Sequence, residues 1–235
     1  MGQNLRQTAL QPGDTVVASA ALTRTGEIVR AAPLMRDQGG EIYSVGEGVL
    51  LDLGNVDDIE APFVELEGTW TGKIISVSDL RAAQNPPAIE SFSPYAAKGA
   101  RIIPLDEMDI NSAADAALAR LYQSGQLFKL FERQADWHAV GIDPDAIRAA
   151  LEPLVPGILT ISQSAWSEAD LDSAIDRLVV DAEGLIVCFE SGVNSKGGIS
   201  GSVVFYRLSD SLAESLSGVP EDLVKVNVWL KPVHR

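Results

Sequence analysis

The sequence LIVCFESGVNSKGGISGSVVFYRL (185–208) forms the most apolar part of the C-terminal half of the chain. Two β-branched runs, 185–189 and 203–208, flank a polar connector with four glycines. Runs of this kind form strands that stay out of water only when the rest of the chain covers them. We therefore expect a central strand–loop–strand of a C-terminal domain, with the connector at 190–201 on the surface.

The other residues of 105–235 alternate between helix and strand patterns. Asp143 before Pro144 is typical of a helix start, because Asp caps free amides and Pro suits the first helical position. The segment 126–133 fits both periodicities, and its alternation favours a strand. Helices are expected at about 112–122, 144–155, 167–178 and 209–216, and strands at 157–162 and 223–230. This predicts an α+β domain in which helices cover one sheet.

The N-terminal part has a β pattern throughout. Strands are expected at 15–23, 28–33, 41–45, 48–53, 63–70 and 73–80. The segment 63–70 (FVELEGTW) alternates apolar and acidic residues, and 49–51 (VLL) is apolar enough to be buried on both faces. Six short strands without a helix are typical of a small barrel or sandwich.

The long first segment and the closing pair FVELEGTWTGKIISVSDL (63–80) resemble an OB-fold barrel over about residues 14–80. OB-folds bind oligonucleotides or oligosaccharides through aromatic residues on their middle strands. Here those strands offer only Tyr43. The resemblance therefore implies a barrel and argues against a nucleic-acid ligand. Trp70 is expected to be buried at the end of this barrel.

Prolines and glycines divide the chain after this region. Residues 81–104 contain Asn85-Pro86-Pro87, Ser93-Pro94 and Pro104, which interrupt any long element. The predicted domains are therefore a β-barrel at 1–80, a Pro-rich connector at 81–104 and an α+β domain at 105–235.

Composition limits the partners. The 235 residues are 46% hydrophobic and 22% charged, as in globular proteins, and the formal net charge is −15. This charge repels nucleic-acid backbones, and the sequence contains no Lys/Arg run to oppose it. No apolar run is long enough for a membrane span, and no secretory pattern is visible, so we expect a cytoplasmic protein. The acidic character leaves a protein partner open and does not indicate an oligomeric state.

Few residues suit catalysis. The sequence has two histidines, His138 and His234, and one cysteine, Cys188. We expect His138 to be half-buried and Cys188 to be a small buried hydrophobe within a strand. No metal, cofactor or catalytic residue is predicted. These observations favour a non-enzymatic binding or protein-interaction module of unknown ligand.

The glycine-rich connector is the candidate site. Loops of this kind can turn successive backbone N–H groups toward an anion, and a lysine adds positive charge. The predicted ligand-binding residues are Glu190, Asn194, Ser195, Lys196, Gly197 and Gly198. This gives an alternative function, a small-molecule or anion-binding protein or enzyme. A plain hairpin with glycines at positive φ also fits, and a further alternative is an acidic inhibitor or immunity-type protein that binds a basic partner.

Overall fold

The computed structural model describes residues 5–57, 59–94, 101–103, 113–133, 136–155, 157–182 and 185–233. Its strands and helices confirm the α+β class. Contacts divide the chain into two units. The first comprises Met1–Ser91, Asp176–Glu190 and Ser202–Arg235, and the second comprises Phe92–Ile175 and Ser191–Gly201. The bounds of these two units differ from the predicted domains 1–80 and 105–235, and the predicted domain layout stays a prediction.

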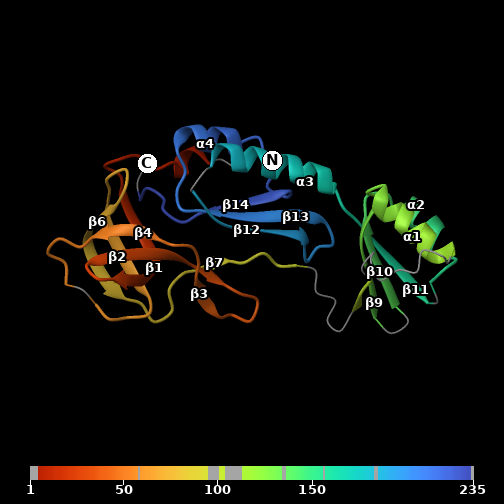
Figure 1. Ribbon diagram of the computed structural model, residues 1–235, viewed down its shortest axis with the longest axis horizontal. Helices are drawn as coiled ribbons and strands as arrows, with labels where there is room; N and C mark the ends of the chain where they lie inside the picture. Colours follow the sequence, from red (N-terminus) through yellow and green to blue (C-terminus); the bar gives the residue numbers. More distant parts are fainter. Residues whose placement is uncertain are drawn as a thin grey trace. The chain divides into compact units, whose positions relative to one another are not determined.

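All six expected N-terminal strands are present in the first unit, with a seventh, β7. They are β1 Thr15–Thr25, β2 Ile28–Arg36, β3 Ile42–Ser44, β4 Val49–Asp52, β5 Val64–Trp70, β6 Ile75–Ala82 and β7 Ile89–Glu90 (Figure 1). Strand β1 pairs with β5, β5 with β6, β6 with β4, β4 with β2, and β2 again with β1. The pairings therefore close a circuit, here called the five-strand ring. Only the β4–β6 pair in it is parallel.

The length of β1 makes this circuit possible. Its first half pairs with β5 and its second half with β2, and Ala20 takes part in both ladders. Gly26, at φ +62°, lies in the tight turn to β2. The alternation in β5 buries every second residue and turns the glutamates outward. Trp70, 3% exposed, belongs to the core inside the ring, which confirms its expected burial.

Strand β4 differs from its prediction. Val49 and Leu51 pack against the core of the ring, but all three residues of 49–51 are only half-buried. The expectation of burial on both faces is wrong because the outer face of β4, where Leu50 lies, borders an open pocket.

The expected strand–loop–strand is present as β12 Ile186–Val193 and β13 Ile199–Phe205. The sheet order is β12-β13-β14, with β14 at Val224–Val228. Strand β13 lies in the middle, and all seven of its residues are buried. The second apolar run therefore contributes to the core as predicted, whereas residues 185–189 are only half-buried because β12 is an edge strand of this sheet. The expectation of a surface connector at 190–201 is wrong in its bounds, since 190–193 and the buried residues 199–201 belong to the strands and only 194–198 form the turn.

The C-terminal residues also complete the ring. Leu230 is fully buried in the core of the ring, and Val16 forms a bridge with Pro232. The indole Nε1 of Trp229 donates to the carbonyl of Ser19 at 2.9 Å. The interior of the ring thus includes residues from both ends of the sequence.

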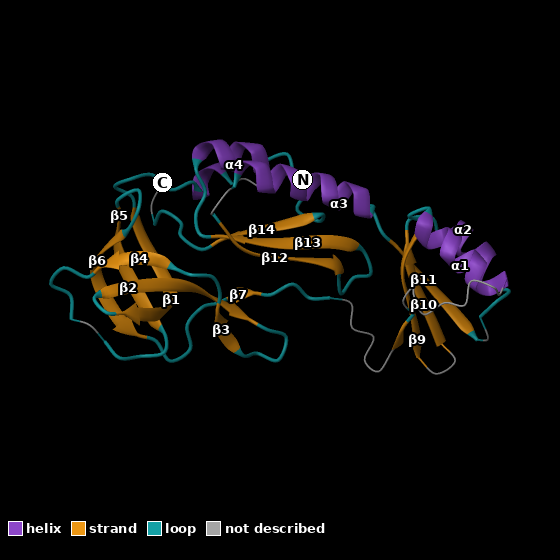
Figure 2. Ribbon diagram, viewed as in Figure 1, coloured by secondary structure: helices purple, strands orange, loops and turns teal. Residues whose placement is uncertain are grey.

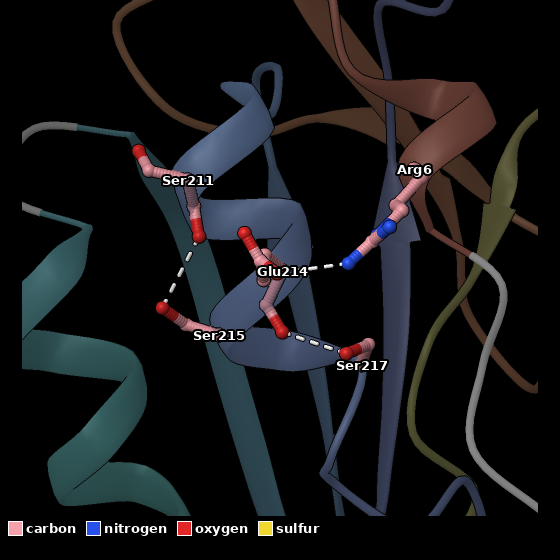
Figure 3. A network of polar contacts seen from close by, with 5 residues as sticks. All are labelled: Arg6, Ser211, Glu214, Ser215 and Ser217. Atoms are coloured by element: carbon pink, nitrogen blue, oxygen red, sulfur yellow. Dashed lines mark hydrogen bonds and ion pairs between the residues drawn. The ribbon is translucent and has the colours of Figure 1, made fainter.

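A short polar network joins the N-terminal segment to helix α4, Asp210–Leu216 (Figure 3). Arg6, in the 3₁₀ turn Arg6–Thr8, forms an ion pair with Glu214 at 2.8 Å. Ser209 caps α4 by accepting from the amide of Leu212. Since both ionic side chains are about 70% exposed, the pair adds little to stability.

The second unit contains a separate sheet. Its order is β11-β10-β9-β8, with β8 Arg101–Ile102, β9 Leu127–Arg133, β10 Asp136–Gly141 and β11 Ile158–Gln163. Helices α1 Ala113–Gln123 and α2 Pro144–Leu151 lie on one side of this sheet (Figure 2). Asp143 caps α2 as predicted, and its carboxylate accepts from the amides of Asp145 and Ala146. Helix α3 spans Glu168–Asp181.

The prediction of one sheet after residue 105 is therefore wrong. Strand β10, which was not predicted, pairs with β9 on one side and in parallel with β11 on the other. Helix α2 forms the crossover that a parallel pair needs. These strands pair among themselves, so β12–β14 form a sheet of their own. Strand β9 confirms the interpretation of 126–133 as a strand.

Within the described ranges, no helix has both the length and the apolar character required to cross a membrane.

Candidate functional site

An open pocket of about 640 Å³ lies on the outer face of the five-strand ring. Every residue that lines it belongs to the first unit. The lining comes from β2, the segment 46–50, the β5–β6 turn, the beginning of β12 and the two residues after β13. This volume is in the range that binds small molecules.

Cross-strand pairing directs two side chains into the pocket. Arg30 on β2 is the pairing partner of Leu50 on β4, and the next pair, Ala31 and Val49, contacts the core of the ring. Because successive strand residues point to opposite faces, Arg30 and Leu50 share the outer face. The Nη1 of Arg30 donates to the carbonyl of Gly48 at 3.1 Å, which holds the guanidinium at the pocket.

The segment 46–48 can follow its path only with glycines at both ends. Gly46 and Gly48 have φ values of +74° and +79°. A Cβ on Gly48 would lie 2.6 Å from the carbonyl oxygen of Ala31, and one on Gly46 would collide with the hydroxyl of Tyr206. The amide of Gly48 donates to that same hydroxyl at 2.9 Å. Tyr206 therefore fixes this loop at the edge of the pocket.

Three cationic side chains line the pocket: Arg30, Lys73 and Arg207. The guanidinium carbon of Arg207 lies 5.3 Å from the centroid of the Trp70 ring, a cation–π arrangement. Burial lowers the pKa of Arg207. Among the described residues of the lining, Glu47 is the one carboxylate. The pocket thus has a formal charge of +2 in a chain whose net charge is −15.

The predicted glycine-rich site has a different geometry. The Asn194 Oδ1 accepts from the amides of Lys196 at 2.9 Å and Gly198 at 3.2 Å. The Asn194 carbonyl accepts from the amide of Gly197 at 2.9 Å. The amide of Ser195 donates to the carbonyl of Ser93 at 2.9 Å. Four consecutive amides of the connector are therefore bonded to the protein itself. This is the arrangement of a closed hairpin loop.

The structure brings together five of the six predicted binding residues. Asn194, Ser195, Lys196, Gly197 and Gly198 form one tight turn between β12 and β13. Glu190 lies within β12 and belongs to the other unit by contacts. Its charge contributes to raising the pKa of Tyr43 and Cys188, after the larger effect of burial. The ligand site at this loop stays a prediction.

His138 is half-buried, as expected, whereas Cys188 lies within β12 as expected but is half-buried rather than fully buried. Burial raises the pKa of Cys188 to about 11, and its thiol donates to the sulfur of Met35 at 3.3 Å. Burial lowers the pKa of His138, whose Nε2 lies 3.0 Å from the Oγ of Ser162. Within the described residues, no group of three or more His, Cys, Asp or Glu is arranged to hold a metal ion.

Sequence reasoning missed the pocket on the ring. Arg30, Lys73 and Arg207 are far apart in the sequence, and only the closure of the ring and the return of the C-terminal strands bring them together. A local signal existed in Gly46-Glu47-Gly48, since two glycines around one residue indicate a backbone under steric restriction. The pocket is the candidate site that the geometry favours. The chain has no match among protein-family models, curated proteins or solved structures.

Proposed function

We propose that the protein is a non-enzymatic binding protein, that its five-strand ring is an OB-like barrel, and that its ligand occupies the pocket on the ring. The circuit β1-β2-β4-β6-β5-β1 supports the barrel, because OB-folds are five-stranded Greek-key barrels. The long first strand shared by two neighbours supports it as well.

The position of the pocket carries the proposal. OB-folds bind their ligands on the face of the second and third strands and with the loop between the fourth and fifth. Those strands of the ring are β2 and β4, and that loop is the β5–β6 turn. They provide Arg30, Leu50 and Lys73 to the pocket lining.

The chemistry of the lining supports binding rather than catalysis. The described residues around the pocket include apolar side chains, two aromatic rings, three cations and one carboxylate. General acid–base or nucleophilic catalysis needs a reactive side chain next to a second group that orients or activates it. Glu47 is exposed, and within the described residues no hydrogen bond or ion pair links its carboxylate to another group.

A fragment screen by NMR of the ¹⁵N-labelled protein tests this function. Bound fragments should shift the amide signals of 46–50, 71–73, 185–187 and 206–207. Leu50→Trp should fill the pocket and abolish these shifts. Val179→Trp, on an exposed position of α3 outside the pocket, should preserve them. Fragments that bind Leu50→Trp as well as the wild type, or that shift other regions only, would contradict the proposal.

A further inference from the structure

The three cations of the pocket outnumber its one described carboxylate, Glu47. Within the described part of the chain, no ion pair links Arg30, Lys73 or Arg207 to a carboxylate. In a chain with 33 acidic and 18 basic residues, a pocket that collects three cations departs strongly from the average surface. Charge of one sign in a concave site attracts ligands of the opposite sign.

Arg207 shows this most clearly. It is half-buried, and burial without a paired anion disfavours a charged guanidinium. The indole of Trp70 is 3% exposed and supports one face of the guanidinium. The N–H groups of the Arg207 guanidinium point outward in its own plane, where a carboxylate or phosphate can accept two hydrogen bonds from them.

Arg30 is held in place before any ligand arrives. One of its nitrogens is bonded to the carbonyl of Gly48, and that loop is fixed by Tyr206. A positioned cation loses less side-chain entropy on binding than a free one. Lys73 is exposed in the β5–β6 turn, where its ammonium can reach the same ligand from the open side.

The remaining wall is apolar. Leu50 from β4 and Ile186 and Val187 from β12 line the pocket beside the cations. A bare inorganic ion would leave these side chains in contact with water. An anion attached to an apolar body would cover them and remove this apolar surface from water, which favours binding.

We propose that the occupant of the pocket is an organic anion. Its carboxylate or phosphate lies between Arg30, Lys73 and Arg207, and its apolar body lies against Leu50 and the beginning of β12. This inference rests on the proposed function, since it assigns a ligand class to the same site. It accounts for both the charge and the apolar wall of the pocket.

Four probes of similar size separate the possibilities: benzoate, phenyl phosphate, benzyl alcohol and benzylamine, each titrated into the ¹⁵N-labelled protein. The two anions should shift the pocket amides with dissociation constants at least tenfold below those of the alcohol and the amine. Comparing the anions identifies the preferred head group. Inorganic phosphate alone should bind at least tenfold more weakly than phenyl phosphate.

Variants assign the effect to the cations. Lys73→Ala and Arg207→Ala should each weaken anion binding about tenfold, and Arg207→Lys should retain part of the affinity because it keeps the charge. Lys225→Ala removes an exposed cation of β14 outside the pocket and should have no effect. Folding of each variant is checked from its NMR spectrum.

The outcomes distinguish this inference from the proposed function. If benzylamine or benzyl alcohol shifts the pocket amide signals with the same affinity as the anions, the proposal of an organic anion is overturned. The proposal that the pocket binds a ligand is then unaffected. Equal affinity for inorganic phosphate and phenyl phosphate would overturn the proposal that an apolar body of the ligand contacts the pocket wall. If no probe shifts the pocket amides, and no fragment of the screen does so, both proposals fall.

Discussion

Two loops of this protein each contain a glycine at nearly the same positive φ, and they differ in what they leave for a ligand. Gly48 in the segment 46–48 and Gly197 in the turn 194–198 have φ values of +79° and +80°. In the turn, Asn194 accepts hydrogen bonds from the amides of residues 196–198. Beside the segment 46–48, three cations face a pocket without an ion pair to any described carboxylate.

This difference shows what glycines in a sequence indicate. They mark places where the backbone needs a positive φ or where another group comes too close for a Cβ. Whether such a loop can bind an anion depends on how its amides and the neighbouring charges are already used. The glycine-rich turn uses its amides internally, whereas the segment 46–48 uses its glycines to lie against β2 and Tyr206.

The largest effect is expected for Gly48→Ala. The new Cβ would lie 2.6 Å from the backbone oxygen of Ala31, which cannot move without disturbing the β2–β4 ladder. Positive φ and this clash together should lower the free energy of unfolding by about 3 kcal/mol. Gly54→Ala, at φ +53° with open space around it, is the matched control and should cost about 1 kcal/mol. Equal losses in urea denaturation would contradict the close approach.

Gly197→Ala is expected to cost somewhat less, about 2 kcal/mol. Its Cβ would lie 2.8 Å from the Cβ and Oγ of Ser162, which are side-chain atoms of a β11 residue rather than backbone. Ser162→Gly in the same protein should recover part of this loss, measured as a coupling in a double-mutant cycle. Strictly additive losses would show that the contact is not the cause.

Asn194→Ala removes the side chain that closes the turn. Three hydrogen bonds disappear, to the amides of Lys196 and Gly198 and to the hydroxyl of Ser200, and stability should fall by about 1–2 kcal/mol. Hydrogen exchange of the two amides should accelerate. Asn194→Asp keeps the accepting oxygen and should retain their protection, so fast exchange in that variant would argue against the closed turn.

His138 makes the region around Ser162 sensitive to pH. Because burial lowers its pKa in the folded protein, the unfolded chain binds the proton more tightly. Its contribution to stability is present above the ordinary pKa of about 6.5 and is lost as the pH falls below that value. The melting temperature should therefore decline more between pH 7 and pH 5 in the wild type than in His138→Gln. Parallel curves would contradict the shifted pKa.

The smallest effect is expected for Glu214→Gln. The ion pair with Arg6 is exposed, so its loss should change the free energy of unfolding by about 0.5 kcal/mol or less. The change in the free energy of unfolding of this variant measures what an exposed polar network contributes, for comparison with the change in Asn194→Ala. A loss of 2 kcal/mol would show that the N-terminal segment depends on this pair.

Local patterns predicted most of the elements of this fold. Alternation located β5 and β9, and the Asp143-Pro144 pair located the start of α2. Strand β10 was not predicted because the alternation in DWHAVG covers only four residues before Val140 and Gly141, and the strand is defined by its pairing with two neighbours. Tertiary pairing of this kind cannot be read from one segment.

The pocket was harder to predict for a related reason. Leu50 looked like a fully buried residue because its apolar neighbours Val49 and Leu51 are part of the same run. Which side of a strand is covered depends on what packs there, and β12 and Arg207 come from residues more than 130 positions later. The glycine-rich turn stood out in the sequence, but the bonds that close it come from the side chain of Asn194, whose orientation only the structure gives.

The burial of Leu230 inside the ring has a consequence for biosynthesis. A ribosome makes the first strand of the ring at Thr15, yet the residue that completes its core appears more than 200 positions later. Contacts so distant in sequence form slowly, and a chain that lacks them exposes apolar surface. The nascent ring therefore cannot complete its core until Leu230 has been synthesised, more than 200 residues after its first strand.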